Sequence, residues 1–265
     1  MKSSILAAGC DMGSLTIKVA LIDNGTLLGS KIANSGAEPA QTAETLMRQL
    51  LHEYNKNSHD IDICISTGYG RQNVSFANEN RSEISCHAAG AYFLNPSVRT
   101  VIDIGGQDCK VISLNDQGQM NNFVMNDRCS AGTGHCMEYL ASVLGLSVEK
   151  MGQMRPFLPF IPHISNKCSI FMELEVLQLR VAHYSIRSIS AGIADATARR
   201  VATLAGGISI NKEICLTGGV SKNILVTKYL QKYLKTPVVL LPYDPQIIGA
   251  IGAAIIGIKK LQYRF

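Results

Sequence analysis

The sequence predicts an α/β fold made of two copies of one design. In each copy an apolar strand ends in an Asp-x-Gly turn, and a second strand rich in β-branched residues follows it. The first copy spans residues 5–23 with Asp11 at its turn, and the second spans residues 100–114 with Asp103 at its turn. Two such hairpins about ninety residues apart indicate a duplicated fold with a cleft between its halves.

The remaining sequence patterns supply helices and strands for both halves. The spacing of Ala43, Leu46, Leu50 and Leu51 predicts a helix over residues 38–54. Further helices are expected at residues 85–94, 134–144, 171–184, 186–205, 222–234 and 245–260. Further strands are expected at residues 61–67, 213–217 and 238–241, and a long irregular loop at residues 154–169. We place one domain at residues 1–95 plus 245–265, with the last helix folding back onto it, and the other at residues 96–244.

Composition excludes several classes of protein. The 265 residues are 46% hydrophobic and 17% charged, which is typical of an ordered globular protein. A net charge of +5 without a long basic run, and with few aromatic residues, argues against nucleic-acid binding. The longest apolar stretch, residues 249–258, is shorter than the about 20 residues that span a bilayer. The apolar N-terminal stretch is broken at Gly9-Cys10-Asp11, unlike a signal peptide. We therefore expect a cytoplasmic protein with no membrane partner.

The two Asp-x-Gly hairpins are candidates for binding nucleotide phosphates. Glycine turns expose backbone N–H groups to which phosphate oxygens can come close. Asp11 and Asp103 would hold Mg²⁺, and Gln107 stands where the attacking water must be oriented. The residues expected at the phosphates are Gly13, Ser14, Thr16, Lys18, Gly105 and Gly106. The alternative is that each Asp-x-Gly is only a hairpin turn.

Two further glycine-rich turns precede helices. Gly218 and Gly219 follow the strand at residues 213–217, which is how open α/β sheets form a nucleotide-facing edge. Gly-Gly is common at strand ends, so this turn alone is weak evidence. The second turn, Gly132-Thr133-Gly134, opens a helix whose backbone amides are expected to face phosphate.

The eight cysteines are not expected to form disulfides, because the cytoplasm keeps thiols reduced. No Cys-x-x-Cys pair is present, which excludes a zinc ribbon or a thioredoxin-like motif. Cys129, beside Arg128, and Cys168 stand in polar loops at helix starts, where the metal-binding thiolate is favoured. A cubane cluster commonly needs four thiolates, so two per chain would be completed by a symmetric dimer. The alternative reading, favoured for Cys10, Cys64, Cys109 and Cys215, is that cysteines here are small buried hydrophobes.

Longer motifs resemble one family over nearly the whole chain. The sequence resembles the activator ATPases of 2-hydroxyacyl-CoA dehydratases, in the BadF/BadG/BcrA/BcrD ATPase family, which also includes ATPase subunits of benzoyl-CoA reductases and reductases of double-cubane cluster proteins. The motifs that carry the resemblance are Asp11-x-Gly13-Ser14 with Lys18, Thr67-Gly68-Tyr69-Gly70-Arg71, Glu83-Ile84-Ser85-Cys86-His87-Ala88, Asp103-Ile104-Gly105-Gly106-Gln107-Asp108, Asn126-Asp127-Arg128-Cys129 with Ala131-Gly132-Thr133-Gly134, Cys168 with Glu173-x-Glu175, Thr217-Gly218-Gly219-Val220, and Gln246-x-x-Gly249.

This resemblance implies an actin-like ATPase fold, with two duplicated ribonuclease-H-like domains and a nucleotide cleft between them. It implies a homodimer that binds ATP and Mg²⁺ and carries one bridging, oxygen-sensitive [4Fe–4S] cluster on Cys129 and Cys168 of each subunit. Gln246 would belong to the nucleotide site. Electrons would pass from a ferredoxin or flavodoxin to a client, either a 2-hydroxyacyl-CoA dehydratase or a double-cubane cluster protein. The alternatives are a small-metabolite kinase or a nucleotide-sensing assembly protein of the same fold, neither of which needs the two cysteines.

Overall fold

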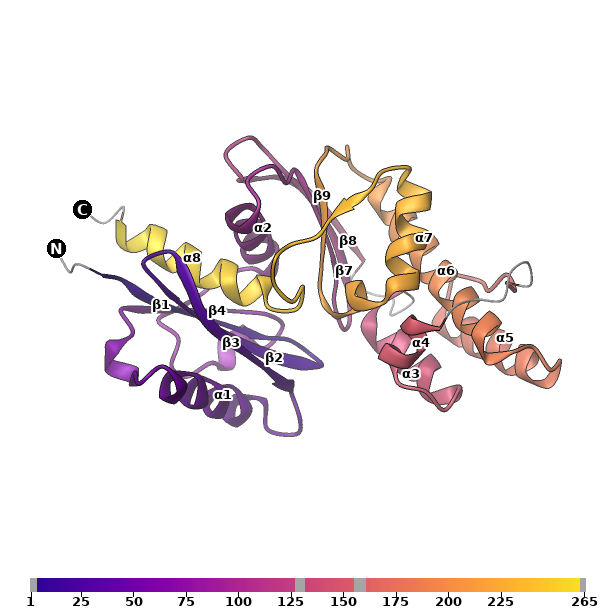
Figure 1. The fold of residues 1–265 in the computed structure, drawn as a ribbon, viewed down its shortest axis with the longest axis horizontal. Coiled ribbons are helices and arrows are strands. Elements are labelled where there is room, and N and C mark those ends of the chain that lie inside the picture. Colours follow the sequence, from indigo (N-terminus) through magenta and orange to yellow (C-terminus); the bar gives the residue numbers. More distant parts are fainter. Residues whose placement is uncertain (1–3, 127–131, 155–160, 263–265) are drawn as a thin grey trace. The chain divides into compact units, whose positions relative to one another are not determined.

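The computed structural model describes residues 4–126, 132–154 and 161–262 (Figure 1). They form two compact units. The first holds the described residues of ranges 1–99, 114–121 and 241–265, and the second those of ranges 100–113 and 122–240. Residues 114–121 thus group with the first unit, whereas the sequence-based division put them in the second. The predicted domain boundaries stay predictions.

The first unit is built on a sheet of order β3-β2-β1-β4-β5. Its central strand β1 is buried along its whole length, which accounts for its continuous apolar sequence. β1 runs antiparallel to β2 with Asp11 opposite Lys18, and parallel to β4 with Asp11 beside Thr67. The strands are β1 (Leu6–Met12), β2 (Thr16–Asp23), β3 (Thr26–Asn34), β4 (Ile63–Thr67) and β5 (Glu79–Asn80).

Helices cover both faces of this sheet, with α1 on one side and α8 on the other (Figure 1). The helices are α1 (Pro39–Glu53), α2 (Glu83–Leu94) and α8 (Ile248–Gln262), with short 3-10 turns η1 (Ser58–Asp60) and η2 (Arg71–Asn73). α1 buries an apolar stripe that includes Leu46 and Leu50, as its sequence spacing predicts. α8 contacts β1, β4 and α2. Glycines let these backbones touch: a Cβ added at Gly252 would lie 1.7 Å from the Cys86 carbonyl oxygen.

The second unit repeats this design on a sheet of order β10-β9-β6-β7-β8. β6 takes the place of β1, with an antiparallel neighbour on one side and a parallel neighbour on the other. Asp103 stands opposite Lys110 of β7 and beside Thr217 of β9, so the register is repeated too. The strands are β6 (Thr100–Ile104), β7 (Cys109–Leu114), β8 (Met120–Asn126), β9 (Ile214–Thr217) and β10 (Val238–Val239). The predicted duplicated α/β fold is confirmed.

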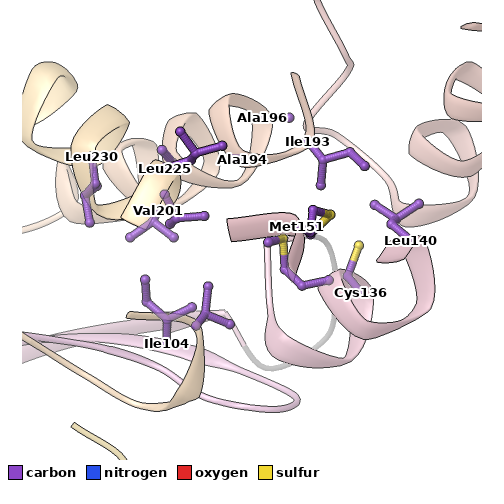
Figure 2. Close-up of a cluster of buried hydrophobic side chains, with 14 of the residues drawn as sticks. Ile104, Cys136, Leu140, Met151, Ile193, Ala194, Ala196, Val201, Leu225 and Leu230 are labelled. Carbon is purple, nitrogen blue, oxygen red and sulfur yellow. The ribbon is translucent and has the colours of Figure 1, made fainter. Parts of the chain in front are cut away.

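Helix α6 forms the centre of the second unit's core. Its small and branched residues, such as Ile193 and Val201, are buried against β6, α3, α4 and α7. Figure 2 shows their side chains converging with those of Ile104, Leu140 and Met151. The helices of this unit are α3 (Gly134–Val143), α4 (Val148–Gln153), α5 (Ser169–Val181), α6 (Ile186–Ala205), the 3-10 turn η3 (Gly219–Lys222) and α7 (Ile224–Leu234). Across the described ranges, no helix combines the length and apolar character needed to cross a membrane.

Candidate functional site

The turn between β1 and β2 places a buried ion pair at the end of the first hairpin. The Lys18 Nζ atom lies 3.2 Å from Asp11 Oδ2, and both side chains are largely buried. The Gly13 amide donates to the Thr16 carbonyl at 3.1 Å, which closes the turn. A Cβ at Gly13 would lie 2.8 Å from the Thr16 carbonyl oxygen and 3.0 Å from Lys18 Nζ, so the turn is tightly packed around this glycine. Ser14 and Thr16 are half-buried at the same turn.

The second hairpin holds a lysine between two carboxylates. Lys110 Nζ lies 3.6 Å from Asp103 Oδ2 and donates a hydrogen bond to Asp108 Oδ1. The side chains of Asp103 and Lys110 are almost completely buried, where a charge needs a partner of opposite sign. The Gly105 amide donates to the Asp108 carbonyl at 2.9 Å, and Gln107 projects from the turn as an exposed residue. Two carboxylates around one lysine leave a net negative charge, which suits a divalent cation.

A Thr-Gly turn flanks each aspartate from the neighbouring parallel strand. Thr67–Gly68 ends β4 beside Asp11, and Thr217–Gly218 ends β9 beside Asp103. Both glycines have positive φ, +93° and +83°. A Cβ would lie 2.6 Å from Asp11 Oδ1 in the first turn and 2.8 Å from Asp103 Oδ1 in the second. The Thr217 hydroxyl donates to Asp103 Oδ1 at 2.9 Å. Each unit therefore carries the same arrangement of Asp, Lys and Thr-Gly.

The predicted Gly132–Gly134 turn is attached to the second hairpin. The amides of Gly134 and His135 donate to the carbonyls of Gly105 and Gly106, both at 2.8 Å. The first amides of a helix lack partners within it, and here the carbonyls of the hairpin turn supply them. These two amides are therefore used inside the protein, although the sequence suggests that they face phosphate. The central threonine of the turn is fully buried.

Helix α8 begins beside the first aspartate. The Gln246 amide donates to Asp244 Oδ1 at 2.9 Å just before the helix. A Cβ at Gly249, in its first turn, would lie 3.1 Å from Asp11 Oδ2 and 2.9 Å from His87 Nε2. The motif Gln246-x-x-Gly249 thus leads directly to Asp11.

The described cysteines divide into buried ones and Cys168. Cys129 lies outside the described residues. The buried cysteines are Cys10, Cys64, Cys86, Cys109, Cys136 and Cys215, which confirms that the strand cysteines act as small buried side chains. Burial raises the pKa of the Cys64, Cys86 and Cys215 thiols to about 12. Cys168 is half-buried and occupies the N-cap position of α5, so its sulfur is the described thiol best placed for an external metal.

Sequence reasoning missed three residues of these sites, Lys110, Asp108 and His87. The signal for Lys110 was present, because it stands seven residues after Asp103, just as Lys18 stands seven residues after Asp11. Asp108 belongs to a recognised motif, but its pairing with Lys110 depends on the turn's conformation. His87 lies in a helix far along the chain from Asp11, and no local pattern links them.

Comparisons with known proteins identify the family of this chain. A family model described as the BadF/BadG/BcrA/BcrD ATPase family matches residues 8–257. An uncharacterized Escherichia coli K12 protein, YjiL, is 41% identical over 250 residues, which cover 94% of this chain and 95% of the relative. The solved structure of the Acidaminococcus fermentans (R)-2-hydroxyglutaryl-CoA dehydratase component A has a TM-score of 0.91 at 34% identity and covers 97% of this chain and 99% of the other. The activator of the Clostridium difficile 2-hydroxyisocaproyl-CoA dehydratase, solved with bound ADPNP, has a TM-score of 0.90 at 32% identity and covers 98% and 97%. The chain therefore has the actin-like ATPase fold and belongs to the BadF/BadG/BcrA/BcrD ATPase family.

Proposed function

We propose that this protein is an ATP-dependent, low-potential electron donor that activates an iron–sulfur client enzyme. The observation that carries the proposal is the position of Cys168: a half-buried thiol at the start of a helix, in a member of an ATPase family, while the other described cysteines are buried.

ATP would be bound through the Asp-x-Gly hairpins. Asp11 and Asp103 supply carboxylate oxygens for Mg²⁺, which would neutralise charge on the phosphates when bound. Lys18 and Lys110 balance the charge of these aspartates and keep them in place. Gln107 is exposed at its turn and free to orient a water molecule. The other proposed nucleotide contacts are Gly13, Ser14, Thr16, Gly105, Gly106, Gly132, Thr133, Gly218, Gly219 and Gln246, without Gly134, whose amide is bound to the Gly105 carbonyl. The activator solved with bound ADPNP, whose fold matches this chain closely, supports ATP binding by this protein.

Cys129 and Cys168 of two subunits would hold one [4Fe–4S] cluster, which supplies one-electron chemistry when bound. Cys168 fits this role because it is accessible, whereas Cys136 in the neighbouring helix α3 is buried. The homodimer has further support from α5, whose first turn follows Cys168. A stripe of large apolar side chains at helical spacing is exposed along this helix: Ile170, Leu174, Leu177 and Val181. Such a stripe on a surface helix indicates a contact with another protein surface.

The client would be a 2-hydroxyacyl-CoA dehydratase or a double-cubane cluster protein, and a ferredoxin or flavodoxin would supply the electrons. Two of the matching solved proteins are a component and an activator of 2-hydroxyacyl-CoA dehydratases, which favours the first client. Coupling requires that ATP bind two states of the dimer with different affinity.

The test is the content of iron and acid-labile sulfide in anaerobically purified protein. We expect about four irons per dimer in the wild type and almost none in Cys168→Ala or Cys129→Ala. Cys136→Ala is the matched control, because it removes a buried thiol from the same unit and should keep the iron. An iron-free wild type that still hydrolyses ATP after reconstitution would reject the electron-donor function and favour a kinase or a nucleotide sensor.

A further inference from the structure

The segment before Cys168, residues 161–168, has no helix or strand and is held by side chains of α5 and α6. The Arg199 guanidinium of α6 donates from Nη2 to the Ile164 carbonyl at 2.6 Å. The Ser165 amide, one residue further, donates to Glu175 Oε2 of α5 at 2.6 Å. Both polar atoms of the Ile164–Ser165 peptide group are thus bound by charged side chains, which make stronger hydrogen bonds than neutral ones.

Arg199 is itself fixed by neighbouring helices. Its Nε donates to Asp195 Oδ2 at 2.9 Å, one turn earlier on α6. The second oxygen of Asp195 accepts a hydrogen bond from the Tyr233 hydroxyl of α7 at 2.5 Å. Burial and the Asp195 carboxylate raise the pKa of Tyr233 to about 12, which extends the pH range over which the phenol can donate this hydrogen bond. The planar guanidinium can bind a carboxylate and a carbonyl at once, which a lysine ammonium group does with less fixed geometry.

The segment also fits closely against α6 further upstream. A Cβ added at Gly192 would lie 2.7 Å from the Pro162 carbonyl oxygen and 3.0 Å from Ile164 Cδ1. Ile164 is fully buried. The path of the chain into Cys168 is therefore set by α6 at two places seven residues apart, Gly192 and Arg199.

We propose that Arg199, supported by Asp195 and Tyr233, is a positioning residue that fixes the segment leading into Cys168 and thereby holds the Cys168 thiol ready for its metal ligand role. The metal part rests on the proposed function, whereas the hold on the segment does not. The hydrogen bonds described for Arg199 go to Asp195 and to the Ile164 carbonyl. Its effect passes through the Ile164 carbonyl, four residues before Cys168.

The test compares Arg199→Met with Arg187→Met, an exposed arginine of the same helix. Amide hydrogen exchange is measured by mass spectrometry on the full-length protein as purified without oxygen. A charged hydrogen bond typically contributes enough to slow local opening about tenfold. We therefore expect exchange within residues 161–168 to be about tenfold faster in Arg199→Met and unchanged in Arg187→Met. Equal exchange in the two variants would overturn the proposal.

Tyr233→Phe gives a second test that removes only a hydroxyl and preserves the ring. It should speed exchange in the same segment about threefold, because Asp195 loses one of its two partners. Unchanged exchange in Tyr233→Phe would overturn the supporting role of this tyrosine. If Arg199→Met does not fold, Tyr233→Phe decides the proposal as a whole, and unchanged exchange would then overturn it.

Iron content separates this proposal from the function on which it partly rests. If the wild type carries the cluster, Arg199→Met should lose at least half of its iron under conditions in which Arg187→Met keeps all of it. Full iron with an unchanged reduced-state EPR spectrum in Arg199→Met would overturn the metal part. A wild type without iron would instead reject the proposed function, and the exchange rates would still decide whether Arg199 holds the segment.

Discussion

Replacing Gly252 by alanine should separate two helices of the first unit. A Cβ at this position would lie 1.7 Å from the Cys86 carbonyl oxygen and 2.7 Å from the Gly90 amide nitrogen of α2. Ordinary contact begins at 3.4 Å, so α8 would have to move by about 1.7 Å (3.4 − 1.7). The obstructing atoms belong to the backbone of a helix, which cannot rotate away as a side chain can.

The magnitude follows from two opposing effects. Overpacking of this kind costs about 3 kcal/mol when backbone must move. Alanine returns about 1 kcal/mol because it favours a helix more than glycine does. The net loss of unfolding free energy is about 2 kcal/mol. Gly257, in the same helix, is the matched control, since a Cβ there meets only side-chain atoms, with Ile63 Cγ2 nearest at 2.9 Å. Its alanine variant should change stability by less than about 1 kcal/mol, because those side chains can adjust.

Urea unfolding followed by far-UV circular dichroism measures both variants against the wild type. Gly252→Ala should unfold at a clearly lower urea concentration and Gly257→Ala near the wild-type midpoint. Equal midpoints for the two variants would refute the reasoning, because the two sites differ mainly in whether backbone or side-chain atoms block the new methyl group.

Two further predictions concern charge and protonation. Asp103→Asn should reduce Mg²⁺-dependent ATP hydrolysis at least about 100-fold and lower the unfolding free energy by roughly 1–3 kcal/mol, because Lys110 loses one of the two carboxylates described beside it. Phosphate release and urea unfolding measure the two effects, and near-normal hydrolysis would remove Asp103 from the proposed site. Stability should fall as pH rises above about 8.5, the usual thiol pKa in an unfolded chain, and keep falling towards 12, the folded pKa of Cys64. As pH rises, the thiol of Cys64 loses its proton in the unfolded chain before it does so in the folded protein, so high pH favours unfolding. Unfolding midpoints between pH 7 and 10 test this, and Cys64→Ala should flatten the slope. An unchanged slope would contradict it.

Local sequence patterns predicted most of the strands and helices of the fold. Each hairpin was readable because its strands, its Asp-x-Gly turn and its β-branched return strand are consecutive in the chain. The strand β3, Thr26–Asn34, was not predicted, because its side chains are mostly partly buried or exposed and its apolar pattern is weak. Helix α4 has six residues, which is too short for helical spacing to be recognised.

Long-range pairing could not be predicted in this way. The sequence analysis treated the turns Thr67–Gly68 and Thr217–Gly218 separately, the first only among the motifs of the family resemblance and the second also as a nucleotide-facing turn. The structure makes them equivalent, because β4 and β9 take the same place in their sheets. The Thr217–Asp103 hydrogen bond joins residues 114 apart, and parallel strand pairs of this kind leave no local signal.

Two glycine turns of the second unit, Gly105–Gly106 and Gly218–Gly219, are each followed by contacts with helices of that unit. Gly105 and Gly106, just after Asp103, accept the first amides of α3, and the Cys129 segment immediately precedes that helix turn. Gly218 and Gly219 open η3 and then α7, whose Tyr233 holds Asp195 and through it Arg199. Described hydrogen bonds of this one unit therefore connect α7, through Tyr233, Asp195 and Arg199, to the segment before Cys168. Each of these contacts consists of one or two hydrogen bonds between rigid elements. Substitutions at Tyr233, Asp195 or Arg199 should therefore alter the coupling between the glycine turns and the segment before Cys168, while the turns and Cys168 keep their own side chains.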